Sequence, residues 1–211
     1  MQREKEPTVP AKIAPTDHPI HELLANRWSP YSFAERAVSE LDLRSIFEAA
    51  RWAPSSYNEQ PWSYIVATRD QEAEYERLLS CLVPPNQAWA KAAPVLAIGV
   101  VRTRFTRNDK PNAAAKHDLG AASAYLTFEA TARGLSVHQM IGIVPDRARE
   151  LYAIPDHSEA LTGIAIGYAA SGDAAPANLR ERDEAPRSRK SLEAFVFRSG
   201  YGKANPFAKG R

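Results

Sequence analysis

The sequence predicts a single domain of the α+β class. Helical and strand-like segments alternate along the chain, but their order and spacing do not suit a simple repetition of βαβ units. No internal repeat and no convincing domain boundary divides the 211 residues, which are enough to bury a sizeable core. We therefore expect one layered structure over residues 20–211, preceded by a loose tail over residues 1–19.

The first half of the chain shows clear helix and strand boundaries. Ser39, with Asp42 three residues later, forms a capping box that marks the start of an amphipathic helix, and this helix stops at Pro54. Residues 95–101 form a continuous apolar run typical of a buried strand. The other elements expected here are a helix over 21–27, a strand over 63–68, a helix over 71–81 ended by Val83-Pro84-Pro85, and a helical turn over 87–91.

The second half begins with an exposed basic loop over 102–116. The longest helical pattern follows over 116–133 and ends before Gly134, which suits the C′ position of a helix. Pro145 suits the first residue of a helix that ends near residue 152. The other elements expected here are a strand over 135–138, a loop over 139–144, a strand over 160–169, an extended polar segment over 171–191, a final strand over 192–197 and a basic tail over 198–211.

The bulk composition argues against several classes of protein. A net charge of +2 gives no global attraction to nucleic acid or to an anionic membrane. The single cysteine, Cys81, excludes an internal disulfide framework and fits a reducing compartment. No apolar run approaches the ~20 residues needed to span a bilayer, and residues 1–19 lack the apolar core of a signal peptide. We expect a cytoplasmic protein without nucleic-acid or membrane partners.

Metal and nucleotide motifs are not found in the sequence. The five histidines lack the spacing of metal ligands, and one cysteine cannot form a thiolate cluster. The Gly202-Lys203 pair lacks the rest of a phosphate-binding P-loop, and no G-x-G-x-x-G pattern follows a strand. The sequence therefore predicts no metal site and no dinucleotide-binding βαβ unit.

The most informative stretch is residues 51–62, which read RWAPSSYNEQPW. A helix stops at Pro54, and a short polar elbow leads into the next strand. The elbow offers the hydroxyls of Ser55 and Ser56, the amide of Asn58 and several backbone groups in a small volume, which suits docking of a flat polar ring. Proline, serine and asparagine are also ordinary turn formers, so a purely structural turn is the alternative.

Two other segments could hold an anion. Arg27 and Ser29 lie at the end of the first helix, and a guanidinium beside a hydroxyl suits binding of a phosphate. Residues 187–190 read Arg-Ser-Arg-Lys within a late polar segment. The alternatives are an exposed cation at a helix end, favoured by the helix dipole, and a solvated run of charge.

Four segments, RWS at 27–29, PSSYN at 54–58, HQMIG at 138–142 and RSRK at 187–190, resemble in chain order the FMN-dependent nitroreductase family. The resemblance covers roughly residues 20 to 200. It implies a nitroreductase-like fold with a central, mostly antiparallel sheet flanked by helices. The FMN-binding residues that it implies are Arg27, Trp28, Ser29, Pro54, Ser55, Ser56, Asn58, Gln139, Met140, Ile141, Gly142, Arg187 and Arg189.

Each segment takes a role from the resemblance. The first and last would hold the ribityl chain and the phosphate, with Lys190 as the weakest member. The elbow would lie along the isoalloxazine ring, and the segment over 139–142 would pass its other face, where Gly142 would allow close approach of the main chain. The stretch over 86–89 could approach the pyrimidine edge. His138 could supply a proton, but a structural role is favoured because lone histidines on apolar strands are usually structural.

Two positions depart from the family pattern. Tyr31 stands where many members have a second cation, so part of the phosphate charge must be met elsewhere. Ile141 stands where many have a carboxylate, which implies a more apolar substrate pocket.

The activity that the resemblance implies is an oxidoreductase using FMN, with NADPH or NADH as electron donor. A ping-pong hydride transfer would reduce nitroaromatic, quinone or similar electron-poor small-molecule acceptors. The resemblance also implies an interlocked homodimer, with the helix over 116–133 in its core and the C-terminal segment embracing the partner. Alternatives are reductive dehalogenation or ring oxidation on the same fold, a non-catalytic flavin- or phosphate-binding protein, and, with little weight, a nucleic-acid binder.

Overall fold

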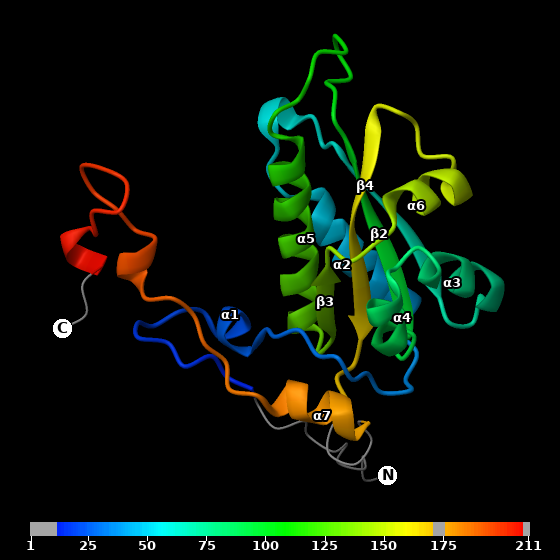
Figure 1. Cartoon of the computed structure of the whole chain (residues 1–211), viewed down its shortest axis with the longest axis horizontal. Coiled ribbons are helices and arrows are strands. Elements are labelled where there is room, and N and C mark those ends of the chain that lie inside the picture. The colour runs from blue at the N-terminus through cyan, green and yellow to red at the C-terminus, as the bar shows by residue number, and fades with distance from the viewer. Residues whose placement is uncertain (1–11, 171–175, 209–211) are drawn as a thin grey trace.

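A four-stranded antiparallel sheet forms the centre of the molecule, in a computed structural model that describes residues 12–170 and 176–208. The strand order is β1-β2-β4-β3. The strands are β1 (Trp62–Thr68), β2 (Val95–Arg102), β3 (Ser136–Met140) and β4 (Ser158–Gly167). Helices cover both faces of this sheet (Figure 1), so the expected α+β class with an antiparallel sheet is confirmed.

The central strand β2 is buried on both faces, which explains its continuous apolar sequence. Leu96 and Ile98 point into a core shared with α3 (Glu72–Leu79), α4 (Pro84–Ala90) and α6 (Pro145–Tyr152). Val95 and Ala97 point into the other core, which α2 (Glu40–Arg51) and α5 (Ala115–Ala132) cover. The sheet is therefore the middle of three layers.

Local sequence signals set several element ends as expected. The Ser39 hydroxyl accepts the N–H of Asp42 at 3.0 Å and caps α2. Gly134 has φ +73° directly after α5, the left-handed conformation that ends many helices. Pro145 is the first residue of α6, where its missing N–H costs nothing.

Four of the expected element boundaries or types were wrong. Pro84 begins α4 instead of ending the preceding helix. Strand β3 runs on to Met140 because it pairs with β4, so the expected loop begins two residues later. The polar segment contains a helix, α7 (Ala177–Glu184), and residues 171–175 of that segment lie outside the described part. Residues 192–197 form a 3₁₀ turn (Leu192–Ala194) and no regular strand.

Two runs of chain, residues 12–27 and 186–208, project together from the body and are called the arm (Figure 1). The first run carries α1 (Glu22–Asn26). Residues 12–19 belong to the stretch expected as a loose tail, and the Ala14 N–H donates to the carbonyl of Ala25 at 2.9 Å. In the described part of the chain, no helix combines the length and apolar character needed to cross a membrane.

Candidate functional site

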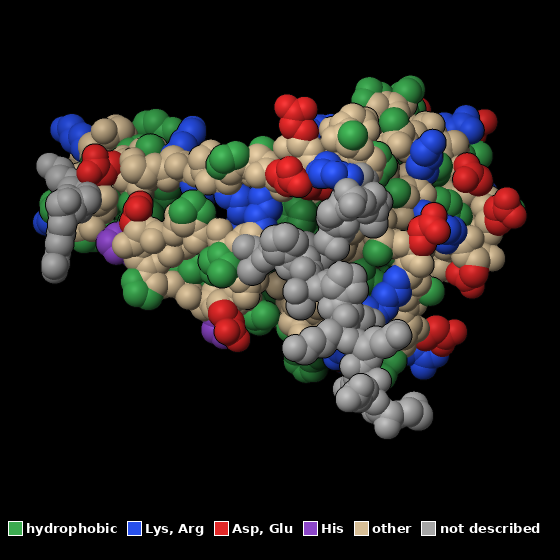
Figure 2. All heavy atoms as spheres, turned by 90° about the horizontal axis from the view of Figure 1, so that it is seen from below, with side chains coloured by type: hydrophobic (Ala, Val, Ile, Leu, Met, Phe, Trp, Pro, Cys, Tyr) green, Lys and Arg blue, Asp and Glu red, His purple; other side chains and the backbone are tan. Residues whose placement is uncertain are grey.

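The arm contains a cavity of about 360 Å³ lined by arginines from both of its runs. Arg27 comes from the end of α1, and Arg187 and Arg189 come from the segment after α7. Lys190 and Asp17 also line it. Figure 2 shows Lys and Arg side chains gathered between the two runs of the arm. The structure thus brings together two basic segments that lie 160 residues apart.

Arg187 holds the two runs together. Its Nη1 donates to the carbonyls of Lys12 at 2.5 Å and Ala25 at 2.7 Å, and its Nη2 donates to that of Arg27 at 2.8 Å. The carbonyls of Ala25 and Arg27 lie at the end of α1, where helix carbonyls lack partners within the helix. Arg187 therefore positions the cavity and adds charge, whereas Arg189, whose Nη1 reaches only the adjacent Ser188 carbonyl, is freer to bind a ligand.

The like charges of the guanidinium groups in this cavity act on one another. Burial lowers the pKa of Arg27, and the charges of Arg187 and Arg189 lower it further. Among the described residues, no carboxylate forms an ion pair with any of the three. The hydroxyl of Ser29 lies 3.3 Å from Nη1 of Arg27. Guanidinium groups with an adjacent hydroxyl are the donor set that a phosphate requires, so these residues fit the phosphate of FMN. Trp28 lies under the Lys12 ammonium, at 4.8 Å from its ring centre.

Two residues on α7 support this cavity and were missed in the sequence. Asp183 accepts the backbone N–H groups of Tyr31 and Ser32. The guanidinium of Arg182 lies 3.6 Å from the ring centre of Tyr31. Arg182 and Asp183 thus hold the segment over 31–32, although neither is among the residues that line the cavity. No local signal marks either residue, because both act through a segment about 150 positions away.

The elbow at Pro54–Asn58 has a strained backbone. Tyr57, Asn58 and Gln60 have φ of 54°, 56° and 51°, a region that non-glycine residues seldom adopt. Side-chain oxygens accept two of its backbone N–H groups: the Ser55 hydroxyl accepts the N–H of Gln60 at 3.0 Å, and the buried Asp118 of α5 accepts that of Ser56 at 3.1 Å. Strain that is held in this way is common at functional sites.

The elbow keeps its polar ends available. Among the described residues, neither the Ser56 hydroxyl nor the Asn58 amide has a hydrogen-bond partner. Asn58 is exposed and Ser56 is half-buried. The donors and acceptors that the sequence placed here can therefore reach a ligand.

The segment over Gln139–Gly142 divides into anchoring and free parts. The Gln139 amide donates to the Ser123 carbonyl at 3.1 Å and thereby fastens β3 to α5. Met140 is buried, whereas Ile141 is 84% exposed. The N–H groups of Ile141 and Gly142 form no hydrogen bond within the described chain. They remain available as donors.

Gly142 has a packing role that the sequence did not reveal. A Cβ at this position would lie 2.3 Å from Nδ2 of Asn86 on α4, and that nitrogen donates to the Gly142 carbonyl at 3.0 Å. The missing side chain leaves room for Asn86. In turn, Asn86 Oδ1 accepts the indole N–H of Trp89 at 3.3 Å.

His138 has a structural environment. Its Nδ1 lies 2.8 Å from the Pro30 carbonyl, so this nitrogen carries the proton and donates. The ring packs against Tyr31 and Trp89, with centroids 4.7 and 4.4 Å away. Burial lowers the pKa of His138. This packing supports the structural role that was favoured.

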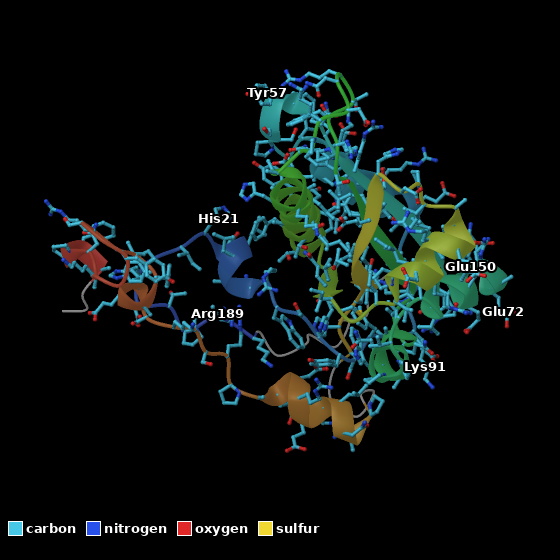
Figure 3. The ribbon with its side chains drawn as sticks, turned by 45° about the horizontal axis from the view of Figure 1, so that its top comes forward. His21, Tyr57, Glu72, Lys91, Glu150 and Arg189 are labelled. Atoms are coloured by element: carbon cyan, nitrogen blue, oxygen red, sulfur yellow. The ribbon has the colours of Figure 1, made fainter. Side chains whose placement is uncertain are left out.

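The elbow and the cationic cavity do not meet within one chain. Figure 3 shows Tyr57 of the elbow at the top of the molecule and Arg189 of the cavity far from it, on the arm at the lower left. The elbow contacts the start of α5 through Asp118, and this 18-residue helix is about 27 Å long. The elbow therefore lies at a distance from the cavity in the same chain.

The chain is similar in sequence to proteins from two bacteria. A protein of Mycolicibacterium smegmatis, described as an uncharacterized 15.4 kDa protein in ask 5'region, is 32% identical over 124 residues, which are 59% of this chain and 82% of that protein. The major NAD(P)H-flavin oxidoreductase of Aliivibrio fischeri is 32% identical over 96 residues, 44% of this chain and 43% of that protein.

A solved structure and a family model cover more of the chain. The crystal structure described as an oxidoreductase containing FMN superposes with a TM-score of 0.84 at 32% identity, over 92% of this chain and 98% of that one. The model of the Nitroreductase family matches residues 24–168. With this match, the antiparallel α+β fold and the order of its basic and polar segments, the chain belongs to the Nitroreductase family.

Proposed function

We propose that the protein is an FMN-dependent NAD(P)H oxidoreductase that reduces nitroaromatic, quinone or similar electron-poor acceptors. Membership of the Nitroreductase family supports the general class of reaction. The FMN named for the similar crystal structure and the NAD(P)H-flavin activity named for the A. fischeri relative support the cofactor and the donor.

The cationic cavity is the observation that carries this proposal. Three arginines that no described carboxylate neutralises line it, and a phosphate would relieve their mutual repulsion. Arg27, Ser29 and Arg189 would contact the phosphate, and Arg187 would position them. Each charge-assisted contact of this kind contributes about 1.5–3 kcal/mol.

The separated elbow supports a homodimer. Pro54, Ser55, Ser56 and Asn58 of one chain would face the ring bound by the partner's cavity. One side of α5 is suited to such an interface, because its exposed and half-buried residues are mostly small or apolar. The residues on this side are His117, Gly120, Ala121, Ala124, Tyr125 and Phe128.

Apolar side chains on the arm point to the same assembly. Ile13, Ile20, Leu24, Phe195 and Phe207 are between 41 and 70% exposed on a projection with little core of its own. Exposed apolar surface of this extent favours association. We propose that the chain over 20–211 is a single domain, and that its C-terminal segment, which forms the second run of the arm, embraces the partner.

When bound, FMN would supply the chemistry for hydride transfer from a nicotinamide to an electron-poor acceptor. The free N–H groups of Ile141 and Gly142 would donate to the ring, and the elbow would hold its other face. The exposed, apolar Ile141 side chain would exclude water from the acceptor side. The lowered pKa of His138 and its bond to Pro30 argue against proton transfer by this residue.

The visible absorption spectrum of the purified protein tests this function. Flavin bands that bleach on anaerobic addition of NADPH or NADH are the expected result, and the faster donor is the preferred one. A colourless protein that takes up no added FMN would contradict the proposal. The homodimer, the cytoplasmic location and the acceptor stay predictions that need their own measurements.

A further inference from the structure

The guanidinium group of Arg107 lies over two aromatic rings beside the elbow. The guanidinium carbon of Arg107 lies 4.3 Å from the ring centre of Tyr57 and 5.2 Å from that of Phe105. The two rings meet edge to face, with centroids 5.8 Å apart and an angle of 81° between their planes. The group joins the elbow to the loop that follows β2.

Backbone contacts hold this loop in place. The N–H of Phe105 donates to the Lys110 carbonyl, and the N–H of Asp109 donates to the Phe105 carbonyl, both at 2.9 Å. Glu59, at the end of the elbow, accepts the N–H of Thr106. The loop is thus held by its own backbone bonds and is joined to the elbow through Glu59, so the cation and the rings form a prearranged surface.

The surface is open and positively charged. Tyr57 is 74% exposed, and Arg107 is exposed as well. Asp109 lies within 4 Å of both Arg102 and Arg104. Arg107 forms no ion pair with a described carboxylate, and the neighbouring Glu59 is committed to Thr106.

Among the described residues, the guanidinium N–H donors of Arg107 have no hydrogen-bond partner, although the group lies over two rings. A cation held over an aromatic face keeps N–H donors with which it can bind an anion. These donors match the two oxygens of a phosphate or carboxylate. The exposed ring of Tyr57 offers a stacking face at the same place.

We propose that Arg107, Tyr57 and Phe105 form a binding site for an anionic group carried by a planar aromatic ligand. The anion pairs with the free N–H donors of Arg107, and the ligand ring packs on the part of the exposed Tyr57 ring that Arg107 does not cover. Two kinds of ligand in the proposed function carry such a group, and the biological role of the site rests on that function. One is the 2′-phosphate and adenine of NADPH, and the other is an aromatic acceptor that bears a carboxylate.

Calorimetric titration of the FMN-loaded protein tests the site without turnover. The probes form two matched pairs, adenosine 2′-monophosphate with adenosine and 4-nitrobenzoate with 4-nitrobenzyl alcohol. Arg107→Gln is expected to weaken one charged probe by about tenfold or more, the size of a lost charge-assisted contact, while its uncharged partner is unaffected. The pair that responds identifies the source.

Control variants separate the site from its surroundings. Lys110→Gln removes one charge from the same loop, so a general field effect would weaken binding equally in this variant. Tyr57→Asn removes the ring but keeps a residue that tolerates positive φ, and it is expected to weaken both members of the responding pair. Equal effects of Arg107→Gln and Lys110→Gln, or no effect on any probe, would overturn the site.

Kinetics provide a second readout that depends on the proposed function. If NADPH is the source, Arg107→Gln raises the KM for NADPH and leaves kcat and the KM for NADH unchanged. A protein that binds the charged probe through Arg107 but oxidises neither nicotinamide would refute the enzyme and keep the site. The two proposals can therefore fail separately.

Discussion

Asp183 on α7 binds Ser32 across 151 positions of sequence, its Oδ2 accepting the Ser32 N–H at 2.9 Å. Its Oδ1 accepts the preceding N–H, of Tyr31, at 2.8 Å. These two bonds join the segment that follows Arg27 to the helix that precedes Arg189. One buried carboxylate thus fixes the relative position of the two halves of the proposed phosphate site.

The first prediction concerns this carboxylate. Asp183→Asn keeps one acceptor but turns an NH₂ group toward the second N–H, which is left unsatisfied in a buried place. We expect the free energy of unfolding to fall by about 1–3 kcal/mol. Urea denaturation measures the change. Glu184→Gln, at the exposed neighbouring position, should stay within about 0.5 kcal/mol of wild type, and equal losses in both variants would refute the role of Asp183.

The second prediction concerns the phosphate contacts. Arg27→Ala or Arg189→Ala should each weaken FMN binding by about 1.5–3 kcal/mol, or roughly 10- to 150-fold in Kd. Quenching of flavin fluorescence on binding to the apoprotein gives the affinity. Arg44→Ala is the control, because Arg44 is an exposed arginine on α2 paired with Glu40. Unchanged affinity in both cavity variants would remove the phosphate assignment.

Features that depend on a few neighbouring residues could be predicted from the sequence. Ser39 caps α2, Gly134 ends α5 and Pro145 begins α6, since each of these signals acts within one helical turn. The helix α7 could not be predicted, because its eight residues have little amphipathic pattern. It is held by the burial of Leu179 and Asp183, which only the folded chain provides.

The candidate site was predictable to a similar degree. The basic segments were found because their residue types and chain order are informative, and the structure does bring Arg27, Arg187 and Arg189 to one cavity. The positioning role of Arg187 was not predictable, because it depends on the backbone carbonyls to which this residue donates. The partner of Gly142 was also hidden, since Asn86 lies 56 positions away.

The third prediction follows from that contact. A Cβ in Gly142→Ala would collide with Asn86 Nδ2 and touch Val83 Cγ2 at 3.0 Å. Asn86 must then move and release its bonds to the Gly142 carbonyl and Trp89. We expect a loss of about 1–3 kcal/mol in unfolding free energy. Ile141→Ala, at the exposed adjacent position, should change stability by less than about 0.5 kcal/mol, and a neutral Gly142→Ala would show that this packing is loose.

The fourth prediction concerns pH. Burial lowers the pKa of His138 below its usual 6.5, so near that pH the unfolded chain binds a proton that the folded chain does not. Above pH 6.5 the histidine is neutral in both states and does not reduce stability. As the pH falls below 6.5 toward the folded pKa, protonation of the unfolded chain lowers the free energy of unfolding. His138→Gln should flatten this part of the stability profile. Urea midpoints measured between pH 5 and 8 test whether stability falls on acidification. The prediction is contradicted if wild-type stability rises on acidification through this range while that of the variant stays flat.

The fifth prediction tests the two-chain site. Ala124 lies on the exposed small-residue side of α5, and Glu at this position would put a charge in the proposed interface. We expect Ala124→Glu to be folded by circular dichroism but monomeric by sedimentation, while wild type is a dimer. Leu41→Glu, an equally drastic change at a 71% exposed position on α2, should remain dimeric.

The same variant separates assembly from cofactor binding. If the partner's elbow completes the FMN site, monomeric Ala124→Glu keeps the arginine cavity but loses the contacts of Ser55, Ser56 and Asn58. Its FMN affinity should then fall, and Asn58→Ala should have no further effect in the monomer although it weakens binding in the wild-type dimer. A monomer that keeps full affinity would show that one chain is enough, and a dimeric Ala124→Glu would show that α5 is not the interface.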